Sequence, residues 1–401
     1  MKKKINMIKD NSNNNPIERV GAICFYVALL IEILIVIIDK SSLINPFEGR
    51  LFQITFVLCM MKIIFTKFNL REWLLMVSFF IVGFISYQVT HRNEIIRFVA
   101  FVAASKGLDN RKMLRVVFYS TFAGMIIIIL LALTKQMGTI FLEVDYYRGV
   151  GVERRYCLGM GHPNALHCMF WALLSLGVYI YHKKLKWYHY LVFLGANIFL
   201  FMLTGSRTGL FVSMIVIVLG GASTILPLEN YRILYLGTSG CIVASTVFSV
   251  IVASINGPEQ MARYPIINWI NIKLTGRLLD SGVTGDIHKW SLFSDNGNKG
   301  YMDMGYIKLF HWYGIAPAIM YLVILVIMVV RSYKRRNVAA VIMILSFSLY
   351  TIAEAHAISP YIGRNYMMML LFGTWSEYFS IMEGDEGYFW QLKRYMKKTK
   401  K

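Results

Sequence analysis

This chain of 401 residues has little cysteine, proline or charge, and each shortage excludes a class of protein. The five cysteines are scattered and show neither metal-ligand spacing nor a disulfide framework, so we expect free thiols and no bound metal (Cys24, Cys59, Cys157, Cys168 and Cys241). Eight prolines and 16% charged residues do not fit the two or three soluble domains that this length would otherwise suggest.

Hydrophobic residues make up 57% of the chain and aromatic residues 14%. Long apolar runs recur, each near the ~20 residues that cross a ~30 Å hydrocarbon core. Backbone groups in lipid must bond within their own segment, so these runs are expected to be helices. The sequence predicts an all-α polytopic membrane protein, with one membrane domain over residues 19–382 and cytoplasmic basic tails at 1–18 and 383–401. The twelve expected spans are 20–38, 51–66, 72–89, 93–106, 115–134, 163–181, 187–203, 209–226, 233–254, 306–330, 338–355 and 363–382.

The net charge of +20 raises the question of a nucleic-acid partner. The basic residues lie in short loops between apolar runs, which argues against nucleic acid and for a lipid bilayer. The larger share of the 42 lysines and arginines falls on the side that holds the two tails. By the positive-inside rule, both termini are expected in the cytoplasm.

Three external segments are longer or more polar than a turn requires: residues 135–162, 204–209 and 255–306. The last contains Tyr264, Trp269, Trp290 and Phe293, which is too aromatic for a disordered segment. We expect it to form amphipathic helices that lie over the membrane.

The first external segment ends in RGVGVERRYCLGMGHPNALH, which gathers arginines and histidines at the start of an apolar helix. Arg148, Arg154 and Arg155 are candidates for binding phosphate, although one or two of them would serve equally well to solvate the loop. His162 precedes Pro163, and proline suits the first position of a helix. A helix N-terminus favours anions, so His162 is either a site residue or only a helix cap. We expect His167 to be a packing residue.

Two further arginines follow or flank glycines in external turns, Arg207 in TGSRTG and Arg277 in LTGRLLDSG. Glycine lets the chain turn sharply and lets a ligand approach closely. A guanidinium fork matches phosphate oxygens two at a time. The alternative is that each arginine only reaches toward the lipid headgroups. Arg364, in the last external turn, is a further candidate.

A base that removes a proton from a sugar hydroxyl would assist its attack on an anomeric carbon. His162, Asp303 and Glu354 are the candidates, and the last two lie at predicted helix ends. Ionisable groups in membrane segments are functional hypotheses by default. Glu32, inside an apolar run, has no assigned role, and we expect it to make a helix–helix contact.

The motifs RRYCLGMGHPNALH, LTGSRTGLF, LTGRL, AEAH and NYMMMLLF, with the hydropathy layout from about residue 20 to 382, resemble the Wzy-type O-antigen and capsular polysaccharide polymerases. The O-antigen ligases share this pattern. The resemblance implies a GT-C-type helical glycosyltransferase fold, a polyprenyl-diphosphate-linked oligosaccharide as donor and acceptor, and neither a cofactor nor a metal. It matches Arg207 and Arg277 to family arginines, and Arg148 with Gly159 to an arginine–glycine spacing.

A late His-Asn pair of the ligases appears here as Asp303-Met304, which favours a polymerase. The expected activity is the joining of repeat units into polysaccharide at the outer face of the plasma membrane, with a chain-length regulator as a candidate partner. The alternatives are an O-antigen-type ligase, a lipid-linked oligosaccharide flippase, which would place polar groups near the middle of its spans, and a membrane acyltransferase.

Overall fold

The computed structural model describes residues 16–145, 151–255, 257–273, 276–280, 290–294 and 302–374. Its α-helices are α2 (Pro16–Lys40), α3 (Glu48–Ile64), α4 (Leu70–Thr90), α5 (Glu94–Ala104), α6 (Asn110–Leu133), α7 (Pro163–Tyr181), α8 (Trp187–Thr204), α9 (Arg207–Ala222), α10 (Arg232–Ala253), α11 (Gly257–Ala262), α12 (Pro265–Lys273), α13 (Arg277–Asp280), α14 (Gly305–Tyr313), α15 (Ile315–Lys334) and α16 (Val338–Ala353). Two strands, β1 (Phe141–Asp145) and β2 (Val152–Tyr156), and three 3₁₀ turns, Leu228–Asn230, Ile362–Arg364 and Met368–Leu371, complete the described elements.

The described part of the chain is mainly helical, as the sequence predicts for a membrane protein. Seven of its helices are long and apolar enough to cross a membrane: α2, α4, α6, α7, α8, α10 and α15. Two shorter apolar helices, α9 and α16, lie among them. All five cysteines are free, as expected.

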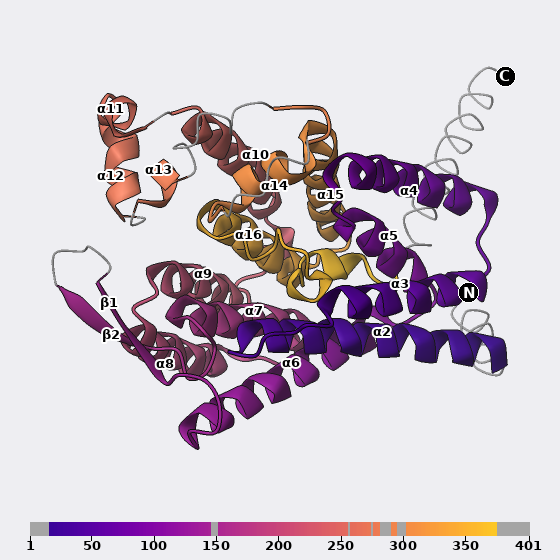
Figure 1. The fold of residues 1–401 in the computed structure, drawn as a ribbon, viewed down its shortest axis with the longest axis horizontal. Coiled ribbons are helices and arrows are strands. Elements are labelled where there is room, and N and C mark those ends of the chain that lie inside the picture. The colour runs from indigo at the N-terminus through magenta and orange to yellow at the C-terminus, as the bar shows by residue number, and fades with distance from the viewer. Residues whose placement is uncertain are drawn as a thin grey trace, which may run out of the picture.

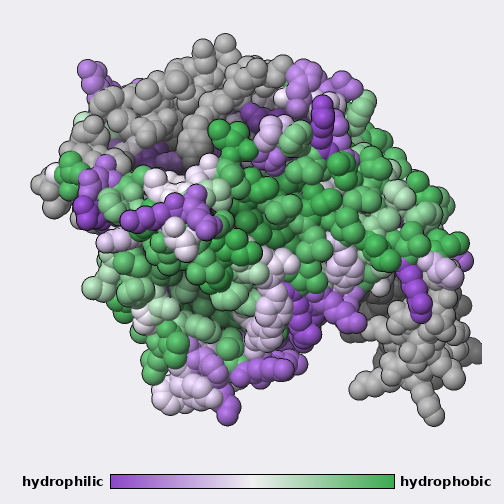
Figure 2. Space-filling view, turned by 60° about the horizontal axis from the view of Figure 1, so that its bottom comes forward, coloured by the Kyte–Doolittle hydropathy of each residue, from purple (hydrophilic) through white to green (hydrophobic). Residues whose placement is uncertain are grey.

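The surface of these helices is apolar where a soluble protein would be polar. On α8, Val192, Phe199 and Met202 are 69%, 61% and 77% exposed, whereas the polar Asn197 and Thr204 are fully buried. This inverted pattern is expected when the solvent is lipid, because an apolar side chain loses nothing by facing it. Figure 2 shows the result as a broad hydrophobic band with hydrophilic residues along its margins.

Helices α7 and α16 form the centre of the molecule (Figure 1). The Trp171 ring on α7 is stacked on Tyr350 of α16, with 4.2 Å between centroids, and lies 4.4 Å from Phe347. Trp171 is fully buried, and most residues of α16 are buried with it. This packing fixes the positions of the residues that cap the two helices, His162 on α7 and Glu354 on α16.

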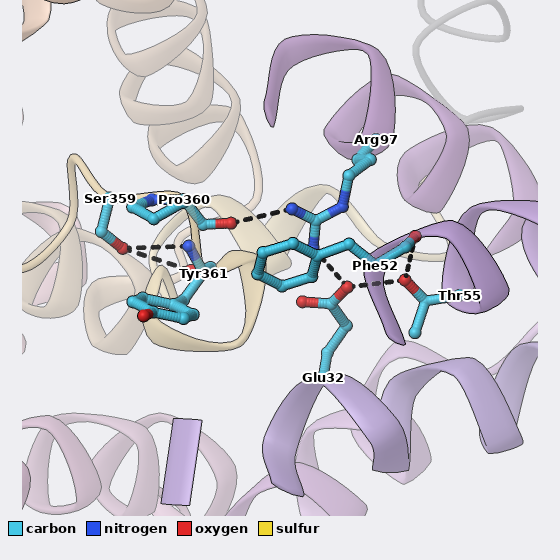
Figure 3. A network of polar contacts seen from close by, with 7 residues as sticks. All are labelled: Glu32, Phe52, Thr55, Arg97, Ser359, Pro360 and Tyr361. Atoms are coloured by element: carbon cyan, nitrogen blue, oxygen red, sulfur yellow. Dashed lines mark hydrogen bonds and ion pairs between the residues drawn. The ribbon is translucent and has the colours of Figure 1, made fainter. Parts of the chain in front are cut away.

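A buried ionic network ties the N-terminal helices together (Figure 3). Glu32 of α2 accepts hydrogen bonds from Arg97 of α5 at 2.5 Å and from Thr55 of α3 at 2.8 Å. Arg97 also donates to the Pro360 carbonyl at 3.0 Å, and its guanidinium lies 3.5 Å from the centre of the Phe52 ring. The expected helix–helix role of Glu32 is confirmed.

Two of the twelve predicted spans are wrong in form, and two others, 51–66 and 93–106, are the helices α3 and α5, whose 17 and 11 residues leave them outside the set of candidate spans. The range 306–330 is broken at Gly314 (φ 92°), which separates α14 from α15 and packs against the backbone of Phe293 and Ser294. The range 363–382 is not one helix, because its described residues, up to 374, form only short 3₁₀ turns. A run of apolar residues therefore does not by itself establish a crossing.

Two of the segments that were predicted to be external contain secondary structure. Residues 135–162 contain the antiparallel hairpin β1–β2, which apolar periodicity did not predict. The described parts of 255–306 include the short helices α11, α12 and α13, so the predicted helical character of this segment is confirmed, whereas its position over the membrane stays a prediction. The hairpin and these helices lie at the same end of the molecule, on the left in Figure 1.

Candidate functional site

Arg277 connects the two acidic candidates at that end of the molecule. Its Nε lies 3.1 Å from Asp303 Oδ2, and its Nη1 lies 2.8 Å from Glu354 Oε1. Nη1 also donates to the Ala353 carbonyl at 3.3 Å. Three residues that the sequence singled out separately thus form one ion-paired group, which we call the Arg277 triad.

Local backbone chemistry assembles the triad. Glu354 is the C-terminal cap of α16, and Arg277 opens α13 directly after Gly276, whose φ of 84° favours glycine. Asp303 precedes α14, which begins at Gly305. A Cβ at Gly305 would lie 2.7 Å from Thr351 Cγ2 and 3.1 Å from the Glu354 carbonyl oxygen, so only glycine lets α14 start against the end of α16.

The electrostatics of Glu354 suit a base. Its side chain is 16% exposed, and burial raises the pKa of its carboxyl above the usual value. Repulsion from Asp303 raises that pKa further, whereas Arg277 lowers it. Glu354 Oε1 lies 2.8 Å from Arg277 Nη1. The carboxylate is therefore ion-paired, yet its raised pKa leaves it more basic than an ordinary glutamate.

His162 is the N-terminal cap of α7, with Pro163 beginning the helix as predicted. The Asn164 backbone N–H donates to His162 Nδ1 at 3.1 Å. In the neutral ring the proton is therefore on Nε2, which makes Nε2 a donor. Burial lowers the pKa of His162, and the positive charges of Arg277 and Arg155 lower it further, so the ring is neutral near pH 7. A cap with this tautomer supplies a hydrogen bond rather than a base.

Arg154 and Arg155 point to opposite faces of the hairpin, as neighbours on a strand must. Arg154 is 57% exposed and pairs with Glu143 across the strands at 2.7 Å. Arg155 is buried and forms an ion pair with Glu153. Of the two arginines, Arg155 is the one whose positive charge helps to lower the pKa of His162. The structure thus separates a solvated arginine from one that faces the site.

The glycine-flanked turn before α9 lies against Arg155. Gly205 (φ 62°) ends α8, and a Cβ there would lie 2.9 Å from Arg155 Nε. Arg207, the first residue of α9, is exposed and forms no ion pair or hydrogen bond within the described part of the chain. Its fork is therefore available to a ligand.

Two expectations about this turn have different outcomes. His167 is a packing residue, as predicted, because it is fully buried and its ring nitrogens contact Thr204 and Asn197 at 3.1 and 2.9 Å. The expectation that Gly209 makes room for a ligand is wrong. A Cβ there would lie 2.6 Å from the His167 ring, so the glycine makes room for helix packing.

The remaining arginine candidates are less accessible. Arg364 pairs with Asp39 and lies over the Tyr361 ring, with its side chain 11% exposed. Its charge is therefore already balanced. Arg148 lies outside the described residues, so its spacing from Gly159 has no structural counterpart.

Sequence reasoning missed three residues near the triad. Lys40, the last residue of α2, is close enough to perturb the pKa values of Glu354, His162 and His356. Lys308 of α14 has its pKa lowered to about 8 by burial and by Arg92.

The third missed residue is His356, whose pKa burial lowers to about 3. It is a buried neutral ring that packs against Trp171. Lys40 and His356 lie at or just beyond helix ends, and Lys308 lies inside α14. An ionisable residue next to or within an apolar run was the signal that was available.

Comparison with known proteins adds no assignment: no protein-family model, curated protein or solved structure matches this chain. Within the described ranges, no group of three or more His, Cys, Asp and Glu side chains is arranged to hold a metal ion. The chemistry of the site must therefore be argued from its own residues.

Proposed function

We propose that this protein is a membrane glycosyltransferase that joins polyprenyl-diphosphate-linked oligosaccharide repeat units into a polysaccharide. The observation that carries the proposal is the Arg277 triad with His162 beside it. These residues come from four distant segments and meet at the ends of apolar helices. A buried acid of raised pKa among fixed cations is the arrangement expected where a hydroxyl must lose a proton as an anionic leaving group departs.

The proposed reaction is a single displacement. Glu354 takes the proton from an acceptor hydroxyl, whose oxygen bonds to the anomeric carbon of the donor. The bond from that carbon to the diphosphate oxygen breaks, and its electron pair leaves with the polyprenyl diphosphate. Asp303 is the second candidate for the base.

The leaving diphosphate requires donors that are already in place, because charge grows on it in the transition state. We assign this role to the exposed fork of Arg207, to Arg155, and to the Nε2–H of His162. Lys40 and Lys308 add positive charge nearby. In this assignment Arg277 holds the Asp303 and Glu354 carboxylates in place. It also lowers the pKa of Glu354, so that the carboxylate can be deprotonated and act as the base.

A lipid carrier also needs an apolar surface next to the charged site. A cleft of about 510 Å³ lies between α4 and α5 on one side and α14 and α15 on the other, and its lining is almost wholly apolar. Glu94, at the start of α5, belongs to this lining, and its charge perturbs Lys308, which also senses Asp303. Ala357, three residues after Glu354, also belongs to this lining, so part of a polyprenyl chain held in the cleft would lie close to the triad.

The finer assignments are also proposals. We assign the fold to the GT-C type, the site to the external face of the plasma membrane, and both termini to the cytoplasm. We count α9 and α16 among the spans because they pack beside α7 and run between the same two ends. Each of these two helices is 16 residues long, or about 24 Å, which a locally thinned bilayer accommodates. Both termini on one side require an even number of crossings, so we also count α3, α5 and the chain after α16, which ends beside Asn110 at the start of α6.

Deletion of the gene tests the proposal against its rivals. We expect single repeat units to remain on the carrier at the external face while long chains disappear. Accumulation only on the cytoplasmic face would instead indicate a flippase. Long chains that persist on the carrier but never reach their final acceptor would indicate a ligase.

A further inference from the structure

A second large cleft, of about 960 Å³, lies at the opposite end of the molecule from the Arg277 triad. It is lined by residues at the end of α7, such as His182, and by the start of α16, such as Val338. Glu354 of the triad lies at the other end of α16, and His162 lies at the other end of α7. Since α7 has 19 residues, about 28 Å separates the two places. The cleft is therefore not part of the proposed active site.

The charge of this cleft is strongly one-sided. Its seven lining lysines and arginines come from three separate segments: Arg111 and Arg115 near the start of α6, Lys183, Lys184 and Lys186 between α7 and α8, and Arg335 and Arg336 before α16. Glu229 is the one carboxylate among the described lining residues. His182 adds no charge near pH 7, because burial lowers its pKa.

Helix ends add to the same potential. The lining includes first-turn residues of three helices, Arg111 of α6, Trp187 of α8 and Val338 of α16. Each helix N-terminus carries about half a positive charge. Asp109 already accepts from the Lys112 N–H of α6, and Asn337 accepts from the Ala340 N–H of α16. The remaining N–H groups at these ends add to the positive potential of the seven basic side chains.

A topology signal accounts for the sign of these charges but not for their convergence. The positive-inside rule requires only that lysine and arginine lie in the cytoplasmic loops. Here three loops direct them into one cleft, where they repel each other. A bound anion would offset the repulsion.

We propose that this cleft binds a phosphate-bearing anion. The ligand chemistry is a phosphate group held by several lysine and arginine side chains and by helix N-termini. It has two sources, the headgroup of an anionic phospholipid in the adjoining leaflet and a soluble phosphate or diphosphate. Basic pockets between the ends of membrane helices suit both.

The test uses the full chain in phosphatidylcholine nanodiscs at fixed ionic strength. Phosphatidylglycerol and inorganic diphosphate are the two probes, and binding is followed by thermal shift and by native mass spectrometry. The cleft variant is Arg115→Gln, Lys183→Gln and Lys184→Gln, three exposed side chains. The control is Lys67→Gln, Arg71→Gln and Lys112→Gln, which removes the same charge from exposed positions on the same side, outside the cleft lining.

We expect wild type and control to bind at least one probe saturably and the cleft variant to bind about a hundredfold more weakly, from roughly fivefold per basic side chain. Binding of phosphatidylglycerol alone identifies a lipid headgroup. Saturable diphosphate binding that competes with the lipid identifies a soluble anion. Equal loss of binding in the cleft and control variants, or no saturable binding of either probe by wild type, overturns the proposal.

Discussion

Replacing Arg277 with lysine separates the geometry of its fork from its charge. The guanidinium reaches Asp303 through Nε and both Glu354 and the Ala353 carbonyl through Nη1. Lysine has a single nitrogen, so it holds one carboxylate and releases the other.

The size of the effect follows from the contacts that are lost. A hydrogen bond to a charged group contributes about 1.5–3 kcal/mol. The three side chains are only 16% to 26% exposed, so solvent screens the contacts in part, and we take about 2 kcal/mol for the lost ion pair. Arg277→Lys should therefore slow polymerisation about 30-fold. Arg277→Gln, which releases both carboxylates, should slow it about 10²–10³-fold.

The pH profile provides a second readout. A base works when deprotonated, so activity should fall as the pH drops through the raised pKa of Glu354. Because Arg277 lowers that pKa, its loss should move the acidic limb of the profile to higher pH. The displacement should be larger for Arg277→Gln than for Arg277→Lys, since lysine keeps the charge.

The assay is the chain-length distribution on gels and the initial rate with purified protein, together with protein abundance in the membrane. Arg50→Lys is the control, because Arg50 is exposed in the first turn of α3, far along the chain from the triad. Wild-type rates and an unmoved acidic limb in both Arg277 variants would refute the reasoning. Arg277 would then be an interfacial anchor.

Three further predictions concern the cap, the buried network and the topology. His162→Asn keeps a good helix cap but removes the Nε2–H donor, so activity should fall about 10–100-fold with little change in melting temperature. His162→Ala should in addition lower the free energy of unfolding by about 1 kcal/mol, because the cap is lost. Equal activity in wild type and His162→Asn would mean that His162 acts only as a helix cap. Glu32→Leu or Arg97→Met alone should lower the free energy of unfolding by about 3–5 kcal/mol, because each single change leaves a buried charge unpaired. The double variant removes both charges, so its loss should be much smaller than the sum of the two single losses. Additive losses in unfolding experiments would contradict this prediction. A cysteine that replaces Val152, which is 69% exposed, should react with a membrane-impermeant reagent in intact cells, whereas a cysteine at the exposed Lys184 should not. The reverse labelling pattern would mean that the protein has the opposite orientation in the membrane.

The sequence allowed the apolar helices and each member of the triad to be predicted, for physical reasons. Periodicity and length reveal a span, and an ionisable residue at a helix end stands out in an apolar chain. Asp303 and Glu354 were found in this way, and Arg277 was found as an arginine that follows a glycine in a loop. Their mutual contact was not predictable, because it depends on the packing of α14 against α16 through Gly305, which no local pattern encodes.

Other features escaped sequence reasoning because lipid-facing and protein-facing apolar runs look alike. The segment after Arg364 is apolar enough for a span, yet its described part packs inside the molecule as 3₁₀ turns, with Tyr366 and Phe372 almost completely buried. Lys40 resembled an ordinary interfacial lysine at the end of a span. Only the folded chain brings it near Glu354.

The most direct measurement of the central claim supplies purified protein with a polyprenyl-diphosphate-linked repeat unit and follows both products. The account predicts a ladder of chains and one polyprenyl diphosphate released for each unit joined. In Glu354→Gln, which is close in size and shape but cannot accept the proton, both products should be lost together while the protein stays folded. A wild-type protein that moves the lipid-linked unit across the bilayer without joining any units, or a Glu354→Gln variant that polymerises at the wild-type rate, would contradict it.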